Sequence, residues 1–126
     1  MKKIIFTPNA PAPIGPYNQA VLVGNTLYTS GQIALHPDTM EIVLDSIASE
    51  TKQVMENMKA VLTEANFTFE QVVKSTIFIT DMNDFAAINA VYENYFNEKT
   101  APARETVQVA ALPKGVHIEI SMIAVR

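Results

Sequence analysis

The sequence predicts an α+β fold in which two helices cover one face of a single sheet. Three observations lead to this fold class: segments with alternating apolar residues, two stretches with helical spacing, and the order strand, strand, helix, strand, helix, strand, strand. The 126 residues match the size of one domain, 1–126, and can bury a core without help from a metal or a disulfide.

Composition and charge argue against several kinds of chemistry and binding partner. The chain has no cysteine, which excludes disulfide and zinc–thiolate chemistry and favours a reducing, cytoplasmic location. Its net charge of −4 gives no indication of a basic surface for binding nucleic acid or an anionic membrane. The apolar run before Pro8 is too short for a signal peptide or a membrane span. We therefore expect neither nucleic acid nor a membrane among the partners.

An extended arm and a hairpin open the chain. Residues 8–17 carry four of the seven prolines and form either a rigid connector or a functional lip that holds Tyr17 in place. We expect strands at residues 20–23 and 26–33, joined by a tight turn at Gly24-Asn25. Gly31 marks a bulge in the second strand or leaves room for a ligand, and a bulge is the simpler interpretation.

A helix and a central strand follow. Apolar residues at helical spacing predict a helix from Asp45 or Ser46 to about Ala65. Ser46 can cap its start and Asn66 can end it. Residues 71–80 are almost continuously apolar or β-branched, which is typical of a central strand covered on both faces.

A second helix is expected to start at Asp81 or Asn83 and to run to about Asn97. Its buried arc consists of Phe85, Ile88, Val91, Tyr92, Tyr95 and Phe96. Asn89 lies at the rim of this arc, where it is either a satisfied boundary amide or a ligand contact.

The last quarter of the chain predicts two strands, 106–112 and 116–125, separated by Pro113-Lys114-Gly115. Direct pairing would mix apolar and polar faces, so either the loop takes a fourth residue or another strand lies between them. In both cases one face is expected to carry Val107, Val109, Ile118, Ile120 and Met122. The opposite face is expected to carry Arg104, Thr106, Gln108, Glu119 and Ser121.

This second face also holds Ile123 and Val125, so we expect it to pack against sister chains. Arg104 and Glu119 would then lie near a subunit boundary, where clefts form readily. An arginine matches a carboxylate with two parallel hydrogen bonds, and a glutamate can position water and accept its proton. The alternative is that the two residues pair with each other.

Five segments together resemble the RidA (YjgF/YER057c/UK114) family: residues 15–20 (GPYNQA), 30–33 (SGQI), 102–104 (PAR), 109–114 (VAALPK) and 118–120 (IEI). The resemblance spans almost the whole chain. It implies a chorismate-mutase-like (ferredoxin-like) subunit with one mixed sheet, and a homotrimer with the sheets inside and clefts between chains.

The resemblance also implies an activity that needs no cofactor. Active members of this family hydrolyse 2-aminoacrylate/2-iminopropanoate and 2-aminocrotonate/2-iminobutanoate to 2-oxo acids and ammonia. Pyridoxal-phosphate-dependent dehydratases release these intermediates, which implies a functional link to such enzymes.

The resemblance also implies a role for each matching site residue. Arg104 matches the arginine that grips the substrate carboxylate, and Glu119 matches the glutamate that holds or activates water. The remaining matches line the cleft: Tyr17, Ser30, Gly31 and Asn89. Thr106 stands where many members have a cysteine and can offer a hydroxyl. Glu105 adds a carboxylate beside Arg104, and strand alternation predicts that it points away.

Other function classes stay open. A binding protein that regulates by holding a 2-oxo acid would use Arg104 without Glu119. Ribonuclease or holdase behaviour is known among relatives, but the acidic chain lacks a basic patch. A chorismate mutase would need more cations than Arg104 and Arg126. His36 and His117 lack metal-ligand spacing, so no metal is expected.

Overall fold

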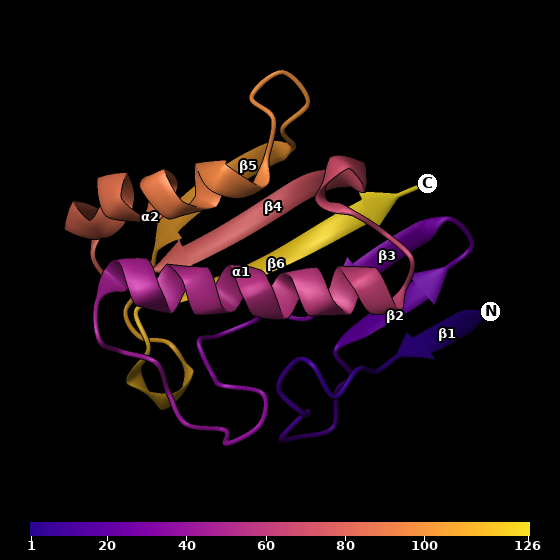
Figure 1. Ribbon diagram of the computed structural model, residues 1–126, viewed down its shortest axis with the longest axis horizontal. Helices are drawn as coiled ribbons and strands as arrows, with labels where there is room; N and C mark the ends of the chain where they lie inside the picture. The colour runs from indigo at the N-terminus through magenta and orange to yellow at the C-terminus, as the bar shows by residue number, and fades with distance from the viewer.

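The computed structural model describes residues 1–126 and consists of one mixed sheet with two α-helices (Figure 1). The strands are β1 (Lys2–Ile5), β2 (Ala20–Val23), β3 (Thr26–Thr29), β4 (Val72–Ile79), β5 (Ala103–Gln108) and β6 (Ile118–Val125). The helices are α1 (Ile47–Glu64) and α2 (Phe85–Tyr92). The strand order is β1-β2-β3-β6-β4-β5, in which only the pair of β4 and β5 is parallel. The predicted α+β class is confirmed.

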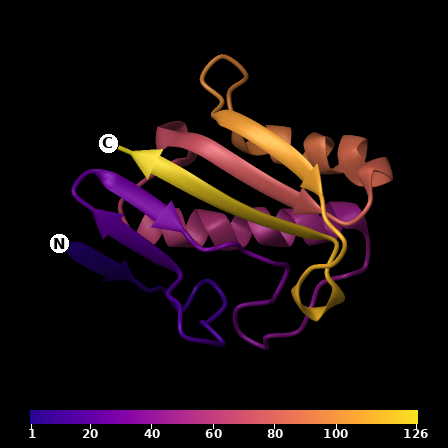
Figure 2. The same cartoon turned by 180° about the vertical axis from the view of Figure 1, so that it is seen from behind.

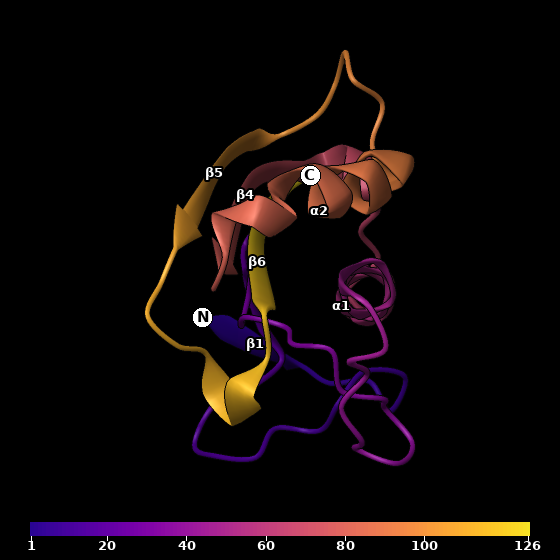
Figure 3. The ribbon, with the colours of Figure 1, turned by 90° about the vertical axis from the view of Figure 1, so that its left-hand side faces the viewer.

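Both helices lie on the same side of the sheet, as the edge-on view shows (Figure 3). Seen from behind, the opposite face carries no helix (Figure 2). The core fills the space between helices and sheet and includes Leu27, Val54, Met55, Met58, Leu62, Ile77, Ile79, Ile118 and Ile120. Neither helix is long and apolar enough to cross a membrane.

The predicted ends of the first helix are confirmed. The Ser46 hydroxyl accepts a hydrogen bond from the backbone N–H of Ser49 (3.1 Å). Asn66 adopts a left-handed conformation with φ of 61° just after the helix. Arg126 donates to the carbonyl of Ala65 (2.8 Å), so this cation stabilises the end of α1.

The second helical segment is interrupted more than the sequence predicts. Short 3-10 turns, Met82–Asp84 and Glu93–Tyr95, flank α2 on both sides. The Asp81 carboxylate accepts from the Asn83 N–H (2.9 Å), which explains the predicted start at either residue.

The position of β5 corrects one prediction. β4 lies between β5 and β6, which was one of the two expected alternatives. However, the register pairs Ile77 with Thr106 on one side and with Ile120 on the other, so these three side chains share a face. Arg104 and Thr106 therefore lie on the helix-covered face.

The residues of β6 that were expected to accompany Arg104 lie on the opposite, open face. Thr76 opposes Glu105 on β5 and Ser121 on β6, so Glu105 and Ser121 share that face with Glu119. Val107, two residues beyond Glu105 on β5, also lies there. The predicted faces of β5 were therefore wrong, because its parallel pairing with β4 fixes its orientation independently of β6.

The open face is rich in apolar side chains. Its most exposed members are between 40% and 49% accessible: Ile4, Val23, Tyr28, Val107 and Val125. Ile123 and Phe78 lie among them. The predicted apolar face is confirmed, and a surface of this kind marks a site of association.

The proline-rich arm is held by a single buried side chain. Gln19 accepts from the Thr7 N–H (2.7 Å) and donates to the carbonyls of Thr7 (3.0 Å), Pro11 (2.9 Å) and Ala10 (3.3 Å). The side chain is almost fully buried. The arm that carries Tyr17 is thereby fixed against the start of β2.

We predict that Gln19→Leu lowers the free energy of unfolding by about 3 kcal/mol, because it leaves several buried backbone groups without partners. Gln71→Leu is the matched control, since Gln71 accepts one exposed hydrogen bond from the Thr68 N–H (3.0 Å). It is expected to cost less than about 1 kcal/mol. Urea denaturation measures both values, and equal losses would contradict the assigned role of Gln19.

Candidate functional site

Arg104 projects from β5 toward α2. Its Nη1 donates to Asn89 Oδ1 (2.7 Å), and its guanidinium carbon lies 5.0 Å from the ring centre of Tyr92 and 5.7 Å from that of Phe85. No carboxylate forms an ion pair with it. A cavity of about 480 Å³ lies beside it, lined by Asn89, Tyr92, Glu93, Phe96, Glu98, Ala101 and Arg104. Arg104 therefore keeps hydrogen-bond donors for a ligand.

Thr106 follows Arg104 on the same face of β5. Its hydroxyl oxygen is buried and has no hydrogen-bond partner in the chain. Buried polar atoms are almost always paired, because an unpaired one costs free energy. The Thr106 hydroxyl is thus a buried polar group that the single chain leaves without a partner.

Glu119 lies on the other face, at the start of β6. A small cavity of about 80 Å³ has Tyr17, Gly31, Pro113 and Glu119 among its lining residues. Burial raises the pKa of the Glu119 carboxyl above its ordinary value. A carboxylate with a raised pKa is a stronger proton acceptor, which suits a group that activates water.

The predicted bulge at Gly31 is confirmed, because three residues lie between Tyr28 and Gln32 but only two lie between their partners on β6, Ile123 and Ile120. A Cβ at this position would lie 2.5 Å from Glu119 Oε2 and 2.7 Å from Glu119 Cδ. The glycine therefore allows the Glu119 carboxylate to lie directly against the backbone. Gln32, the next residue, exchanges two backbone hydrogen bonds with Ile120 (2.8 and 3.1 Å), which keeps this segment beside β6.

Ser30 and Tyr17 belong to the same side of the molecule as Glu119. The Ser30 hydroxyl donates to the carbonyl of Asn18 (2.5 Å) and so ties the end of β3 to the arm. The Tyr17 hydroxyl accepts from the Ile14 N–H (3.3 Å), and about half of the residue is exposed. The arm thus places Tyr17 beside the cavity that Glu119 lines.

One chain brings the predicted site residues together in two groups. Asn89, Thr106 and Arg104 lie on the helix side, whereas the remaining members, Tyr17, Ser30, Gly31 and Glu119, lie around the open face. Arg104 and Glu119 do not pair with each other. We call these groups the arginine half-site and the glutamate half-site.

Glu105 points away from Arg104, as predicted. Its carboxylate accepts from Lys74 Nζ (3.0 Å) and from the Thr76 hydroxyl (3.1 Å) on the open face. Hydrogen bonds from Lys74 and then Thr76 hold the pKa of the Glu105 carboxyl below its ordinary value. The added negative charge is therefore matched by a lysine and leaves the Arg104 guanidinium unoccupied.

A buried glutamate that the sequence did not reveal fixes the start of β6. Glu50 of α1 is 1% exposed and accepts from the backbone N–H groups of His117 (2.7 Å) and Ile118 (3.2 Å). Its other oxygen lies 2.8 Å from His117 Nδ1. His117 therefore lies just before β6 and contacts α1, although the predicted strand began at residue 116.

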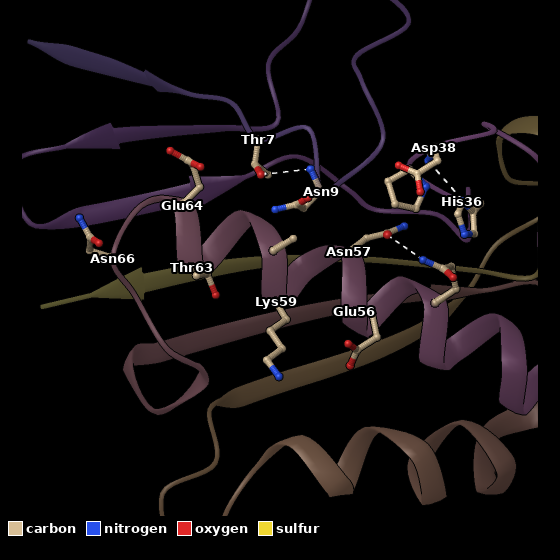
Figure 4. Close-up of a pocket in the computed structure, with 13 residues that line it drawn as sticks. Thr7, Asn9, His36, Asp38, Glu56, Asn57, Lys59, Thr63, Glu64 and Asn66 are labelled. Atoms are coloured by element: carbon tan, nitrogen blue, oxygen red, sulfur yellow. Dashed lines mark hydrogen bonds between the residues drawn. The ribbon is translucent and has the colours of Figure 1, made fainter.

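A separate groove of about 610 Å³ runs along the outer side of α1, and its polar lining is drawn in Figure 4. Its side chains come from α1, the arm and the loop at residues 36–38. Several already bond one another: His36 Nδ1 accepts from the Asp38 N–H (3.2 Å), and Gln53 donates to Asn57 (2.9 Å). The groove contains none of the predicted site residues.

Known proteins resemble the chain over its whole length. A family model described as Endoribonuclease L-PSP matches residues 7–126. A RutC family protein of Synechocystis is 56% identical over 98% of this chain and 95% of its own length. The chain belongs to the RidA (YjgF/YER057c/UK114) family. Another RidA relative is the Escherichia coli 2-iminobutanoate/2-iminopropanoate deaminase, which is 50% identical over 100% of this chain and 99% of its own.

The RidA fold is shared with a structure that holds a ligand. The crystal structure of E. coli TdcF with bound serine superimposes with a TM-score of 0.93 and is 48% identical over 98% of both chains. The resemblance inferred from the sequence motifs is therefore confirmed.

Sequence reasoning missed the two rings that hold the RidA arginine. Phe85 and Tyr92 were expected only in the buried arc of the second helix. The available signal was spacing, since Phe85, Asn89 and Tyr92 stand at positions i, i+4 and i+7 of α2 and so face one side.

We predict that Gly31→Ala lowers the free energy of unfolding by about 2 kcal/mol, because the added methyl overlaps the Glu119 carboxylate. In a Glu119→Ala background the same change is expected to cost less than about 0.5 kcal/mol, because the overlapping atoms are gone. A double-mutant cycle measured by urea denaturation tests this coupling. A full loss in both backgrounds would show that the strain arises elsewhere.

Proposed function

We propose that this chain hydrolyses 2-imino acids, such as 2-iminopropanoate and 2-iminobutanoate, to 2-oxo acids and ammonia. The observation that carries the proposal is an arginine whose charge is not neutralised within the chain and which borders a cavity. A guanidinium of this kind binds a carboxylate with two parallel hydrogen bonds. The deaminase name of the E. coli relative and the serine bound to TdcF support a small amino- or imino-acid ligand.

The complete site requires two copies of the chain. In one copy the sheet separates Arg104 from Glu119, so one side chain cannot reach a ligand held by the other. The open apolar face and the free edge of β5 offer surfaces on which a second copy can pack. We place the arginine half-site of one subunit against the glutamate half-site of its neighbour, in a homotrimer with the sheets inside.

The chemistry needs only water and proton transfers. With the substrate carboxylate on Arg104, Glu119 accepts a proton from water as the oxygen bonds to the C=N carbon, and the nitrogen gains a proton. The carbinolamine then moves its hydroxyl proton to nitrogen, breaks the C–N bond and yields the 2-oxo acid and ammonia. The raised pKa of Glu119 suits both steps, because the carboxyl must accept and return a proton.

The proposed reaction requires no cofactor. Its substrates are unstable enamines and imines, so an enzyme that eliminates water or a similar group from an amino acid must supply them. Pyridoxal-phosphate-dependent dehydratases are enzymes of this class, and we propose them as the functional partners.

We predict that Arg104→Ala lowers kcat/KM by about 10- to 100-fold, because it removes a charge-assisted contact to the carboxylate. The assay follows 2-oxo acid formation from an imine released by a threonine dehydratase. Lys99→Ala is the control, because Lys99 is an exposed cation outside both half-sites. If Arg104→Ala and wild type are equally active, the proposal is wrong. Carboxylate binding that survives Glu119→Ala without any turnover in wild type would instead support a binding protein.

A second prediction tests the shared site. Arg104→Ala and Glu119→Ala chains, each strongly impaired alone, are expected to regain about a quarter of wild-type activity when mixed one to one and reassembled, because neighbours then supply the missing group. Sites built from one chain would gain nothing from mixing. Light scattering of each sample checks that all of them form the same oligomer.

A further inference from the structure

Three side chains of α2 contact the guanidinium of Arg104. Asn89 accepts from Nη1 at 2.7 Å, while the rings of Phe85 and Tyr92 lie 5.7 Å and 5.0 Å from the guanidinium carbon. Each ring is within the range of a cation–π interaction. Together, the amide and the two rings restrict both the position and the plane of the guanidinium.

Tyr92 is anchored more firmly than Phe85. The residue Tyr92 is 6% exposed, whereas Phe85 is 37% exposed. The Tyr92 hydroxyl donates to Ser75 Oγ (2.9 Å), and Ser75 is fully buried on β4. Burial raises the pKa of the Tyr92 phenol, so it stays protonated and can keep donating at neutral pH.

Ser75 stands directly beside Arg104 in the sheet. The register of β4 and β5 pairs these two residues, so the hydroxyl that holds Tyr92 belongs to the neighbour of the arginine itself. A continuous chain of contacts thus runs from Ser75 to the Tyr92 hydroxyl, through the Tyr92 ring, and to the Arg104 guanidinium. A shift of the ring must change the surroundings of the guanidinium.

This restraint matters because arginine is long and flexible. Binding a carboxylate through two parallel hydrogen bonds requires a fixed guanidinium plane, and a side chain that is already ordered loses less freedom on binding. β5 is an edge strand, and the contacts that order the guanidinium come from α2, which Ser75 of β4 supports through Tyr92.

We propose that Tyr92, held by Ser75, is a positioning residue that presets the Arg104 guanidinium for a carboxylate. The proposal rests on the proposed function for its substrate, but the arrangement of the three side chains is measurable without turnover. Tyr92 itself acts through Arg104 and takes no part in proton transfer.

The first test is the NMR spectrum of the arginine Nε–H groups, of which the chain has two, from Arg104 and Arg126. Tyr92→Leu is expected to shift the Arg104 signal, because it removes an aromatic ring 5.0 Å from the guanidinium carbon. The Arg126 signal is the internal control, since that guanidinium lies over Phe67 at 4.5 Å. An unchanged Arg104 signal with an intact Arg126 signal would overturn the proposal.

The second test measures carboxylate binding with 2-oxobutanoate as the probe. Tyr92→Phe and Ser75→Ala each remove the hydroxyl contact and are expected to weaken binding about 5-fold, while Tyr92→Leu weakens it about 10-fold or more. Tyr95→Phe is the matched control, because its hydroxyl donates to Glu56 (2.7 Å) and not to a neighbour of Arg104. It should leave the Kd unchanged.

Kinetics separate positioning from general destabilisation. Tyr92→Phe is expected to raise KM about 5-fold and to leave kcat nearly unchanged, because it disturbs carboxylate binding but not water activation. Equal Kd values for Tyr92→Phe and Tyr95→Phe would overturn the positioning role even in an active deaminase. If the protein proves inactive on imines, the Arg104 signal still decides the proposal.

Discussion

The parallel register between β4 and β5 is the constraint on which the site depends. It pairs Ser75 with Arg104, and so directs the arginine toward α2, away from the face that carries Glu119. A shift of one residue would exchange the faces of β5, bury Glu105 against the helices and place Arg104 among the apolar residues of the open face. The Lys74–Glu105 ion pair on that face supports the observed register, because it joins the same two strands.

The two half-sites are held by different parts of the fold. α2 and β4 order the arginine side, whereas the arm, fixed by Gln19, and the start of β6, fixed by Glu50, order the glutamate side. These supports are buried side chains that bond to backbone or to neighbouring side chains. Each half is therefore ordered by contacts within one chain, which suits the proposed site between subunits.

Local signals in the sequence predicted most of the fold. The Ser46 cap, the turn at Gly24-Asn25 and the apolar strand at 71–80 each depend on neighbouring residues, and all three are confirmed. The four residues of β1 are too few to show a period, and the sequence did not predict this strand. The orientation of β5 depends on which strand it pairs with, a contact that joins residues about 30 positions apart and leaves no local pattern.

The arrangement of the candidate site residues could not be predicted from the sequence. Motif resemblance singled out Arg104, Glu119 and the lip at Tyr17, yet the assumption of a shared face placed the first two side by side within one chain. Gly31 shows the same limit, because the sequence predicted its bulge but not the close approach of a carboxylate to its backbone. That approach depends on Glu119, which lies 88 positions away in the sequence.

Three features cost the single chain free energy. The proposed association of subunits would lower this cost. The Thr106 hydroxyl is buried without a partner, the Glu119 carboxyl is partly desolvated, and the Arg104 guanidinium has no carboxylate. Each cost falls when a ligand or a neighbouring chain supplies the missing group. The free energy that these groups cost the subunit can therefore be recovered on binding, because the groups are already ordered but still lack partners. The same reasoning links the apolar open face to the two half-sites, because association in the proposed trimer would cover the first and complete the second.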